Sequence, residues 1–182
     1  MMAMGVEEER IRLIRFGIDT DLFSPAAKGE CTIRRRLALG DEPVIISMRN
    51  HEPVYDLVTL IRAVPLVLRQ TPKARFVIAG AGTQTKELKA LAVTLAVMDN
   101  IAFTGRIPND ELRSYLKMAD IYVSTALSDA GIAASTAEAM SCGLPVVVTD
   151  SGENREWIVE GKSGFIVPLS SPETLASRIL ML

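Results

Sequence analysis

One short stretch of the chain, residues 128–150, combines acidic, glycine and small residues in the order SDAGIAASTAEAMSCGLPVVVTD. Asp129 and Gly131 lie in a polar loop, and the mostly small residues 133–141 predict a helix that carries Glu138. Because small residues let a ligand come close to the first backbone N–H groups of a helix, this helix start favours an anion. The carboxylate of Glu138 can accept hydrogen bonds from hydroxyl groups. An anion site beside a hydroxyl-binding acid suits a nucleotide diphosphate attached to a sugar.

Polar and glycine residues also follow several predicted strands closely. The strands cover residues 43–48, 75–79, 101–104 and 121–124, and the residues that follow them are Arg49, Gly80, 105–107 and Asp129. In open parallel sheets, ligands bind outside the carboxyl ends of the strands, which lie at one edge. The sequence therefore predicts a single site that contains these residues.

Helical stretches alternate with the strands along the chain. Helices are predicted over residues 56–69, 85–97, 110–118 and 155–159, a helix start at 171–173, and further strands at 11–16, 144–149 and 164–168. Asn109 has the chemistry of an N-cap for the helix that begins at Asp110. Apolar strands that alternate with helices indicate an α/β fold, here a Rossmann-like, doubly wound parallel sheet with helices on both faces.

The acidic stretch resembles the donor-binding signature of retaining glycosyltransferases with the GT-B fold, in the large family 4. That signature has two acids at a fixed spacing and then an E-A-M-A-x-G-x-P-V-V run, which residues 138–147 (EAMSCGLPVV) match closely. In the first half, Ala130 occupies the place of the first acid, and Asp129 lies one residue earlier. The resemblance implies that Glu138 fixes the nucleoside through its ribose hydroxyls and that Asp129, as a shifted substitute, contacts the sugar. A helix cap is the alternative role of Asp129.

The resemblance also implies which residues bind the phosphates. Arg49 would pair with them, because a guanidinium forks onto phosphate oxygens, and Gly131, Ile132 and Ala133 would offer backbone N–H groups. A solvated cation at a strand end is the alternative for Arg49. The family's partner lysine is missing, since residues 52–55 (EPVY) contain no basic residue.

Two further segments are expected to line the donor cleft. Gly80 and Gly82 are two glycines of a dinucleotide fingerprint, but Thr85 stands where the third would be, so the nicotinamide signal is weak. We expect these glycines to let the strand turn sharply into its helix. Arg106 and Ile107 lie where the backbone of the resembled family meets the nucleotide base, and a plain loop is the alternative.

No metal or nucleophilic constellation is evident. His51 is the only histidine; it lies in a predicted loop, and we expect it at the surface. No cysteine or second histidine stands near it to form a metal site. Cys31 and Cys142 are expected as buried free thiols, with pairing as the alternative. In the resembled enzymes, electrostatics stabilise the departing diphosphate, so no metal or other cofactor is expected beside the nucleotide-diphosphate sugar, and the catalytic roles fall to Arg49 and Asp129.

The length of 182 residues suits one α/β domain and is short for a complete two-domain glycosyltransferase. Residues 17–23 resemble the linker into the second domain of such enzymes. We therefore expect residues 1–24 to be an N-terminal segment with a linker remnant and residues 25–182 to be the nucleotide-sugar-binding domain, without its N-terminal acceptor domain. The net charge of −2, with scattered acids and bases, suggests neither nucleic acid nor an anionic membrane surface as a partner.

These observations predict the donor-binding domain of a cytoplasmic retaining glycosyltransferase. The full enzyme would transfer a sugar to a carbohydrate or lipid-linked acceptor, and membrane association of that parent enzyme stays open. Three alternatives remain: a degenerate, non-catalytic nucleotide-sugar-binding module, a doubly wound partner-binding domain without a ligand, and half of a sugar-nucleotide epimerase.

Overall fold

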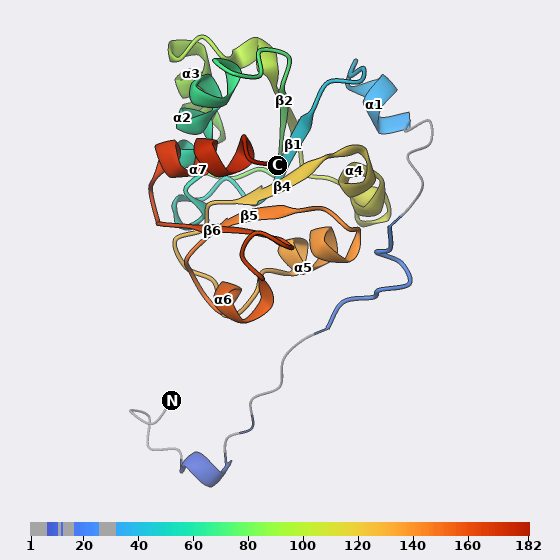
Figure 1. Cartoon of the computed structure of the whole chain (residues 1–182), viewed down its shortest axis with the longest axis vertical. Helices are drawn as coiled ribbons and strands as arrows, with labels where there is room; N and C mark the ends of the chain where they lie inside the picture. The colour runs from blue at the N-terminus through green and yellow to red at the C-terminus, as the bar shows by residue number, and fades with distance from the viewer. Residues whose placement is uncertain (1–6, 11, 13–16, 26–31) are drawn as a thin grey trace.

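A computed structural model of the chain describes residues 7–10, 12, 17–25 and 32–182. Within these residues, six parallel strands form one sheet in the order β3-β2-β1-β4-β5-β6 (Figure 1). The strands are β1 (Val44–Met48), β2 (Arg75–Ala79), β3 (Ile101–Gly105), β4 (Ile121–Ser124), β5 (Val146–Thr149) and β6 (Gly164–Val167). This arrangement confirms the predicted Rossmann-like, doubly wound sheet.

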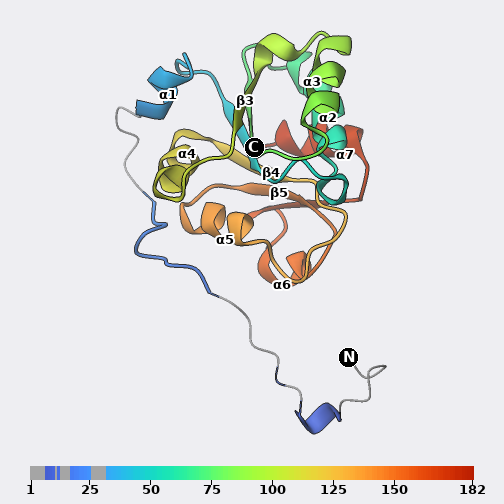
Figure 2. The same cartoon turned by 180° about the vertical axis from the view of Figure 1, so that it is seen from behind.

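Helices cover both faces of the sheet (Figures 1 and 2). One face packs against α2 (Leu57–Leu68), α3 (Thr85–Thr94) and α7 (Pro172–Ile179). The other packs against α1 (Thr32–Arg36), α4 (Leu112–Met118) and α5 (Ala134–Ser141). A short helix, α6 (Asn154–Trp157), follows β5, and four 3-10 turns are described: η2 (Glu8–Arg10), η3 (Pro53–Tyr55), η4 (Met98–Asn100) and η5 (Asn109–Glu111).

The four inner strands, β1, β2, β4 and β5, are buried on both sides, and the alternation of their side chains builds two cores. In β1, Ile45 packs with α2, while the next residue, Ile46, packs with the core that contains Tyr115 of α4. Successive side chains of a strand point to opposite faces, so continuous apolar runs are what a doubly covered parallel sheet requires. The six apolar strands predicted after residue 42 therefore correspond to β1 to β6 of the structure.

Some predicted local features are wrong or were missed. Asn109 is not an N-cap: it is the first residue of η5, Pro108 holds the cap position without a side-chain hydrogen bond, and α4 begins only at Leu112. The helix predicted over residues 85–97 ends at Thr94. Helix α1 was not predicted, because its sequence, TIRRR, offers one buried apolar residue and no helical periodicity.

Predictions in the first part of the chain have mixed outcomes. The strand-like run at residues 11–16 lies outside the described residues except for Arg12, and so does Cys31. Phe23, in the segment expected to precede the domain, is buried in the core beside α1, α4 and α5. Its backbone carbonyl accepts a hydrogen bond from the hydroxyl of Ser141, at the end of α5. Phe23 is therefore part of the core of the domain.

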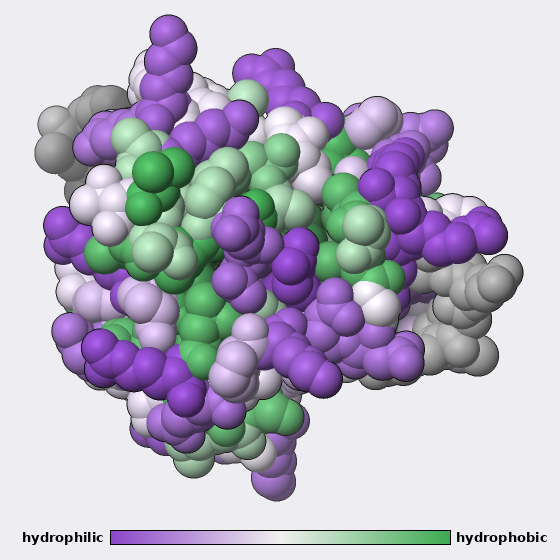
Figure 3. All heavy atoms as spheres, turned by 90° about the horizontal axis from the view of Figure 1, so that it is seen from above, coloured by the Kyte–Doolittle hydropathy of each residue, from purple (hydrophilic) through white to green (hydrophobic). Residues whose placement is uncertain are grey.

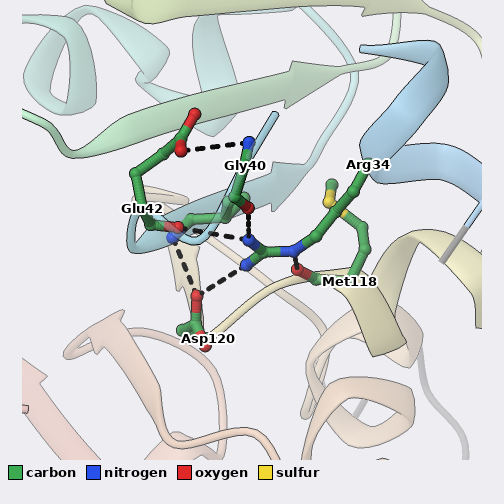
Figure 4. A network of polar contacts seen from close by, with 6 residues as sticks. Arg34, Gly40, Glu42, Met118 and Asp120 are labelled. Atoms are coloured by element: carbon green, nitrogen blue, oxygen red, sulfur yellow. Dashed lines mark hydrogen bonds and ion pairs between the residues drawn. The ribbon is translucent and has the colours of Figure 1, made fainter. Parts of the chain in front are cut away.

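A network around Arg34 joins α1 to the amino end of the sheet (Figure 4). Arg34 Nε donates to the carbonyl of Met118 at 3.0 Å, Nη1 donates to the carbonyls of Gly40 and Glu42, and Nη2 pairs with Asp120 Oδ2 at 3.1 Å. Asp120 Oδ2 also accepts from the backbone N–H at the start of β1 at 2.9 Å. Each guanidinium nitrogen thus has a partner, as a structural arginine requires.

The surface mixes apolar and polar residues. Figure 3 shows the face at the top of Figure 1, where hydrophobic residues form a broken patch between hydrophilic ones. Scattered apolar surface of this kind is common in globular proteins. Among the described residues, no helix is long and apolar enough to cross a membrane.

Candidate functional site

The strand order places the candidate site between β1 and β4. The chain adds strands outward from β1 in one direction and then continues from β4 in the other, so the topological switch point lies between these two strands. Arg49 directly follows β1, and Asp129 lies in the loop after β4. Two of the residues predicted for the site therefore come from the two sides of the switch point.

Arg49 and Asp129 form an ion pair across the switch point. Arg49 Nη2 lies 2.5 Å from Asp129 Oδ1, and the two side chains are only 9% and 14% exposed. The alternative interpretation of Arg49 as a solvated cation is therefore wrong. The capping alternative for Asp129 is also wrong, because Ala133 holds the N-cap position of α5 and makes no side-chain cap.

The guanidinium of Arg49 has one donor left without a partner. Its Nε is buried and has no hydrogen-bond partner among the described residues. The guanidinium carbon lies 4.3 Å from the centre of the Tyr55 ring, so an aromatic face covers one side of the charge. An unsatisfied buried donor costs free energy, and a ligand oxygen that reached it would remove that cost.

The start of α5 provides a second feature that favours an anion. Tyr122, buried in β4, shares a hydrogen bond of 2.7 Å between its hydroxyl and the hydroxyl of Ser135, in the first turn of α5. Burial raises the pKa of the Tyr122 phenol, while the positive charge of Arg49 opposes that rise. The charge of Arg49 thus acts on a hydroxyl that is hydrogen-bonded to the first turn of α5. The free backbone N–H groups of that turn carry the positive end of the helix dipole.

The loop before α5 is packed tightly against the loop after β5. Gly131 has a φ of 139° and accepts a hydrogen bond at its carbonyl from the backbone N–H of Glu153 at 3.3 Å. A Cβ atom added to Gly152 would lie 2.3 Å from the Gly131 carbonyl oxygen and 2.9 Å from that of Asp129. Ile132 and Ala133 are buried. The backbone that carries Asp129 toward α5 is therefore held in place by its neighbours.

Glu138 lies one turn into α5, in the helix that the sequence predicted, and is half-buried. Burial alone raises the pKa of its carboxyl group. Among the described residues, no side chain or backbone N–H donates a hydrogen bond to this carboxylate. A carboxylate in such surroundings is ready to accept hydrogen bonds from ligand hydroxyls.

A cavity of about 350 Å³ opens at the carboxyl ends of β1, β2 and β3. Its lining residues are Met48, Asn50, Ala79, Gly80, Arg106, Ile107 and Leu112. Gly80 adopts a φ of 114°, and a Cβ atom there would lie 2.4 Å from the carbonyl oxygen of Arg49. Glycine at this position thus lets the loops after β1 and β2 approach each other. The structure brings Gly80, Arg106 and Ile107 together, as predicted for residues of one cleft.

Gly82 has a packing role beside the cavity and is not among its lining residues. A Cβ atom at Gly82 would lie 2.4 Å from the carbonyl oxygen of His51. Glu52 accepts hydrogen bonds from the backbone N–H of Thr83 at 2.9 Å and from its hydroxyl at 2.5 Å, and these bonds lower the pKa of the Glu52 carboxyl. The loop that lacks the expected lysine is therefore bound to the turn after β2.

The prediction of a surface position for His51 is wrong. Its side chain is 1% exposed, and Nδ1 lies 2.9 Å from the hydroxyl oxygen of Thr85. The ring meets Phe103 edge-on, Nε2 is buried without a partner among the described residues, and burial lowers the pKa of the imidazole. Nothing in the sequence marked this burial, because it depends on the glycine turn that folds over the histidine.

Sequence reasoning also missed both tyrosines near Arg49. The Tyr55 ring lies over the guanidinium of Arg49, and the charge of Arg49 acts on the Tyr122 phenol, but neither tyrosine belongs to a motif that would have identified it. Cys142 is a buried free thiol, as predicted, and burial raises its pKa. Over the described part of the chain, no group of three or more His, Cys, Asp or Glu residues could hold a metal ion.

Comparisons with known proteins agree on one family. Residues 30–182 match the model of the family Glycosyl transferases group 1. A GDP-mannose-dependent alpha-(1-6)-phosphatidylinositol monomannoside mannosyltransferase of Mycolicibacterium smegmatis is 31% identical over 169 residues, which are 90% of this chain and 44% of that protein. The chain thus spans less than half the length of this curated relative.

Two solved structures share the fold. The Anabaena protein HepE, in complex with UDP and glucose, gives a TM-score of 0.87 at 22% identity and covers 99% of this chain and 49% of that one. The C-terminal domain of a group 1 family glycosyl transferase (LpcC) from Francisella tularensis gives a TM-score of 0.80 at 24% identity, over 91% of this chain and 87% of that one.

Proposed function

This chain belongs to the glycosyl transferases group 1 family and has the Rossmann-like fold of its C-terminal domain, and we propose that it binds the nucleotide diphosphate of a sugar donor. The observation that carries the proposal is the buried Arg49: its Nε has no partner among the described residues, and its charge acts on the Tyr122 hydroxyl, which is hydrogen-bonded to the first turn of α5. Both features favour an anion, and they meet at the switch point where open α/β sheets bind ligands.

The remaining features suit the rest of a nucleotide. The unpaired, half-buried carboxylate of Glu138 is available to ribose hydroxyls. The cavity beside Arg106 and Ile107 is large enough to hold a base, and backbone groups of that loop can meet the edge of the base. Asp129, beside Arg49, would face the sugar attached to the diphosphate.

We further propose that the whole protein transfers this sugar with retention to a carbohydrate or lipid-linked acceptor. The bond between the sugar and the diphosphate breaks, a bond to the acceptor oxygen forms on the same face, and the acceptor proton passes to the departing phosphate. Arg49 and the start of α5 would stabilise the negative charge that develops on the leaving group. Because the chain spans less than half of its mannosyltransferase relative, we expect it to bind the donor but to transfer little or no sugar alone.

Calorimetric titration of the 182-residue chain with UDP, GDP and ADP, then with their hexose conjugates, tests the donor site. Both UDP and GDP are needed, because HepE binds UDP and the mycobacterial relative uses GDP-mannose. We expect one diphosphate to bind, and Arg49→Ala to weaken that binding about 30- to 100-fold, the usual effect of a hydrogen bond to a charged group. Glu138→Ala should also weaken it.

Matched control variants distinguish a loss of ligand contacts from a nonspecific effect of the substitution on folding. Arg62→Ala removes an exposed arginine of α2, and Glu87→Ala removes an exposed acid of α3. Both should bind the diphosphate like the original chain. Unchanged affinity in Arg49→Ala and Glu138→Ala, on folded samples, would refute the proposed site.

A second candidate, a degenerate module that binds the donor without catalysis, is favoured by one specific observation. The loop after β1 holds no lysine, and its Glu52 is occupied by Thr83. Restoring the family pattern with Ala130→Glu and Val54→Lys should strengthen donor binding if the site has degenerated. If Asp129 has taken over the role of the missing acid, the same double variant should leave affinity unchanged or reduce it.

A further inference from the structure

The position of Asp129 suggests a role beyond contact with the sugar. We propose that Asp129 is the counter-ion of Arg49 before a donor binds and that its displacement makes the site select sugar-bearing diphosphates over bare ones. This inference rests on the proposed function, and it names the residue that distinguishes the donor from the spent nucleoside diphosphate.

The first step is competition for Arg49. Asp129 Oδ1 lies 2.5 Å from Arg49 Nη2, and both side chains of this ion pair are largely buried. The ring of Tyr55 lies over one face of the guanidinium. A phosphate that forks onto Arg49 through the free Nε and the neighbouring Nη2 therefore competes with the carboxylate for Nη2. Breaking a buried pair leaves an uncompensated charge, so the displaced carboxylate needs a new partner.

The second step concerns what the carboxylate meets afterwards. The backbone at Asp129 is held by the loop after β5, since a Cβ atom at Gly152 would lie 2.9 Å from the Asp129 carbonyl oxygen. Only the short side chain can move, so the carboxylate stays next to the bound phosphate. The Asp129 carboxylate and the phosphate are both negative, so they repel each other when they lie side by side.

The third step separates the two ligands. In a sugar nucleotide, the sugar is attached to the phosphate at Arg49, and its hydroxyls can donate to Asp129. A bare nucleoside diphosphate offers no hydroxyl there and carries more negative charge, so the repulsion is not offset. After sugar transfer, the ion pair re-forms as the spent diphosphate leaves. The re-formed pair thus favours release of the spent diphosphate.

Titration of Asp129→Asn with the preferred nucleoside diphosphate and its hexose conjugate tests this role. Asparagine keeps the shape and removes the charge, so we expect the bare diphosphate to bind about tenfold tighter than in the original chain. The preference for the hexose conjugate over the bare diphosphate should fall by a similar factor. Asp129→Ala serves as a second variant, and inorganic pyrophosphate as a probe without base or ribose should also bind both variants more tightly.

A double variant locates the effect. In an Arg49→Ala background, adding Asp129→Asn should give a smaller gain, because no ion pair is left to displace and only the repulsion between the carboxylate and the phosphate is removed. Equal or weaker binding of the bare diphosphate in folded Asp129→Asn and Asp129→Ala would overturn the inference and leave the proposed function standing. Absence of binding of any nucleotide or sugar nucleotide to the original chain would overturn the inference together with the proposed function.

Discussion

Two arginines at opposite ends of the same sheet show how structure and function divide in this domain. Arg34, near the amino end, donates from all three guanidinium nitrogens to three carbonyls and the Asp120 carboxylate (Figure 4). Arg49, at the carboxyl end, is more deeply buried, has one ion pair, and keeps Nε without a partner among the described residues. The more buried arginine is therefore the less satisfied one.

The same contrast extends to the neighbours of each arginine. Around Arg34, Asp120 also accepts the backbone N–H of Val44, so the network binds α1 to two strands. Around the carboxyl ends, His51 Nε2 and the Glu138 carboxylate join Arg49 Nε as polar groups that the described residues do not satisfy. Since buried polar groups are normally paired, such a concentration at one edge is typical of a ligand site.

The largest effect on stability is expected at Arg34. Arg34→Ala removes all the guanidinium donors: the carbonyls of Gly40, Glu42 and Met118 lose this donor, and the Asp120 carboxylate loses its ion pair while it keeps the backbone N–H of Val44. Because the pair is partly exposed, we expect a loss of about 2–3 kcal/mol in the free energy of unfolding, less than for a fully buried pair. Urea unfolding measures it, with the exposed neighbour Arg35→Ala as the control. Where the variant is folded, its nucleotide affinity should be unchanged. A loss of affinity would contradict the claim that Arg34 serves stability and not ligand binding.

A smaller effect is expected from the pH dependence of His51. Burial lowers the pKa of its imidazole from the ordinary value of 6.5, so the unfolded chain binds the proton more readily than the folded one. Stability should therefore fall as the pH drops below 6.5, by at most about 1.4 kcal/mol per pH unit. Among the charged groups around His51, Lys89 also lowers the pKa of the imidazole and Glu52 raises it.

Unfolding at a series of pH values between about 7.5 and 5.5 tests this linkage. His51→Gln should remove this contribution to the slope while keeping a hydrogen-bonding group near the Thr85 hydroxyl. An equal dependence of stability on pH in the original chain and the variant would show that folding does not lower the pKa of His51.

The smallest effect is expected at Glu138 and has the opposite sign. Burial raises the pKa of this carboxyl, so the charged form costs stability at neutral pH, and protonation as the pH falls removes that cost. Glu138→Gln should therefore raise the melting temperature of the unliganded chain by about 2 °C, the effect of less than about 1 kcal/mol. The same variant should bind nucleotide more weakly. A lower melting temperature would indicate that the carboxylate is already satisfied.

The sequence predicted the sheet, since apolar runs and the turns between them are local signals. It also predicted that Arg49, Gly80 and Asp129 share one edge, because parallel topology dictates where strand ends meet. It did not predict that Arg49 and Asp129 pair, since this contact joins loops separated by 80 residues and depends on how each loop turns. The burial of His51 was missed for a related reason: Gly82 lets a distant turn close over it.

The central claim is that ligands bind at the carboxyl edge and that the amino end serves stability. Mapping ¹⁵N backbone chemical shifts of the 182-residue chain during titration with the preferred nucleoside diphosphate tests it most directly. The account predicts shifts at Gly80, Gly131 and Ala134, and none at Val44 or Asp120. Shifts confined to the amino end around the Arg34 network, or spread evenly over both ends, would contradict it.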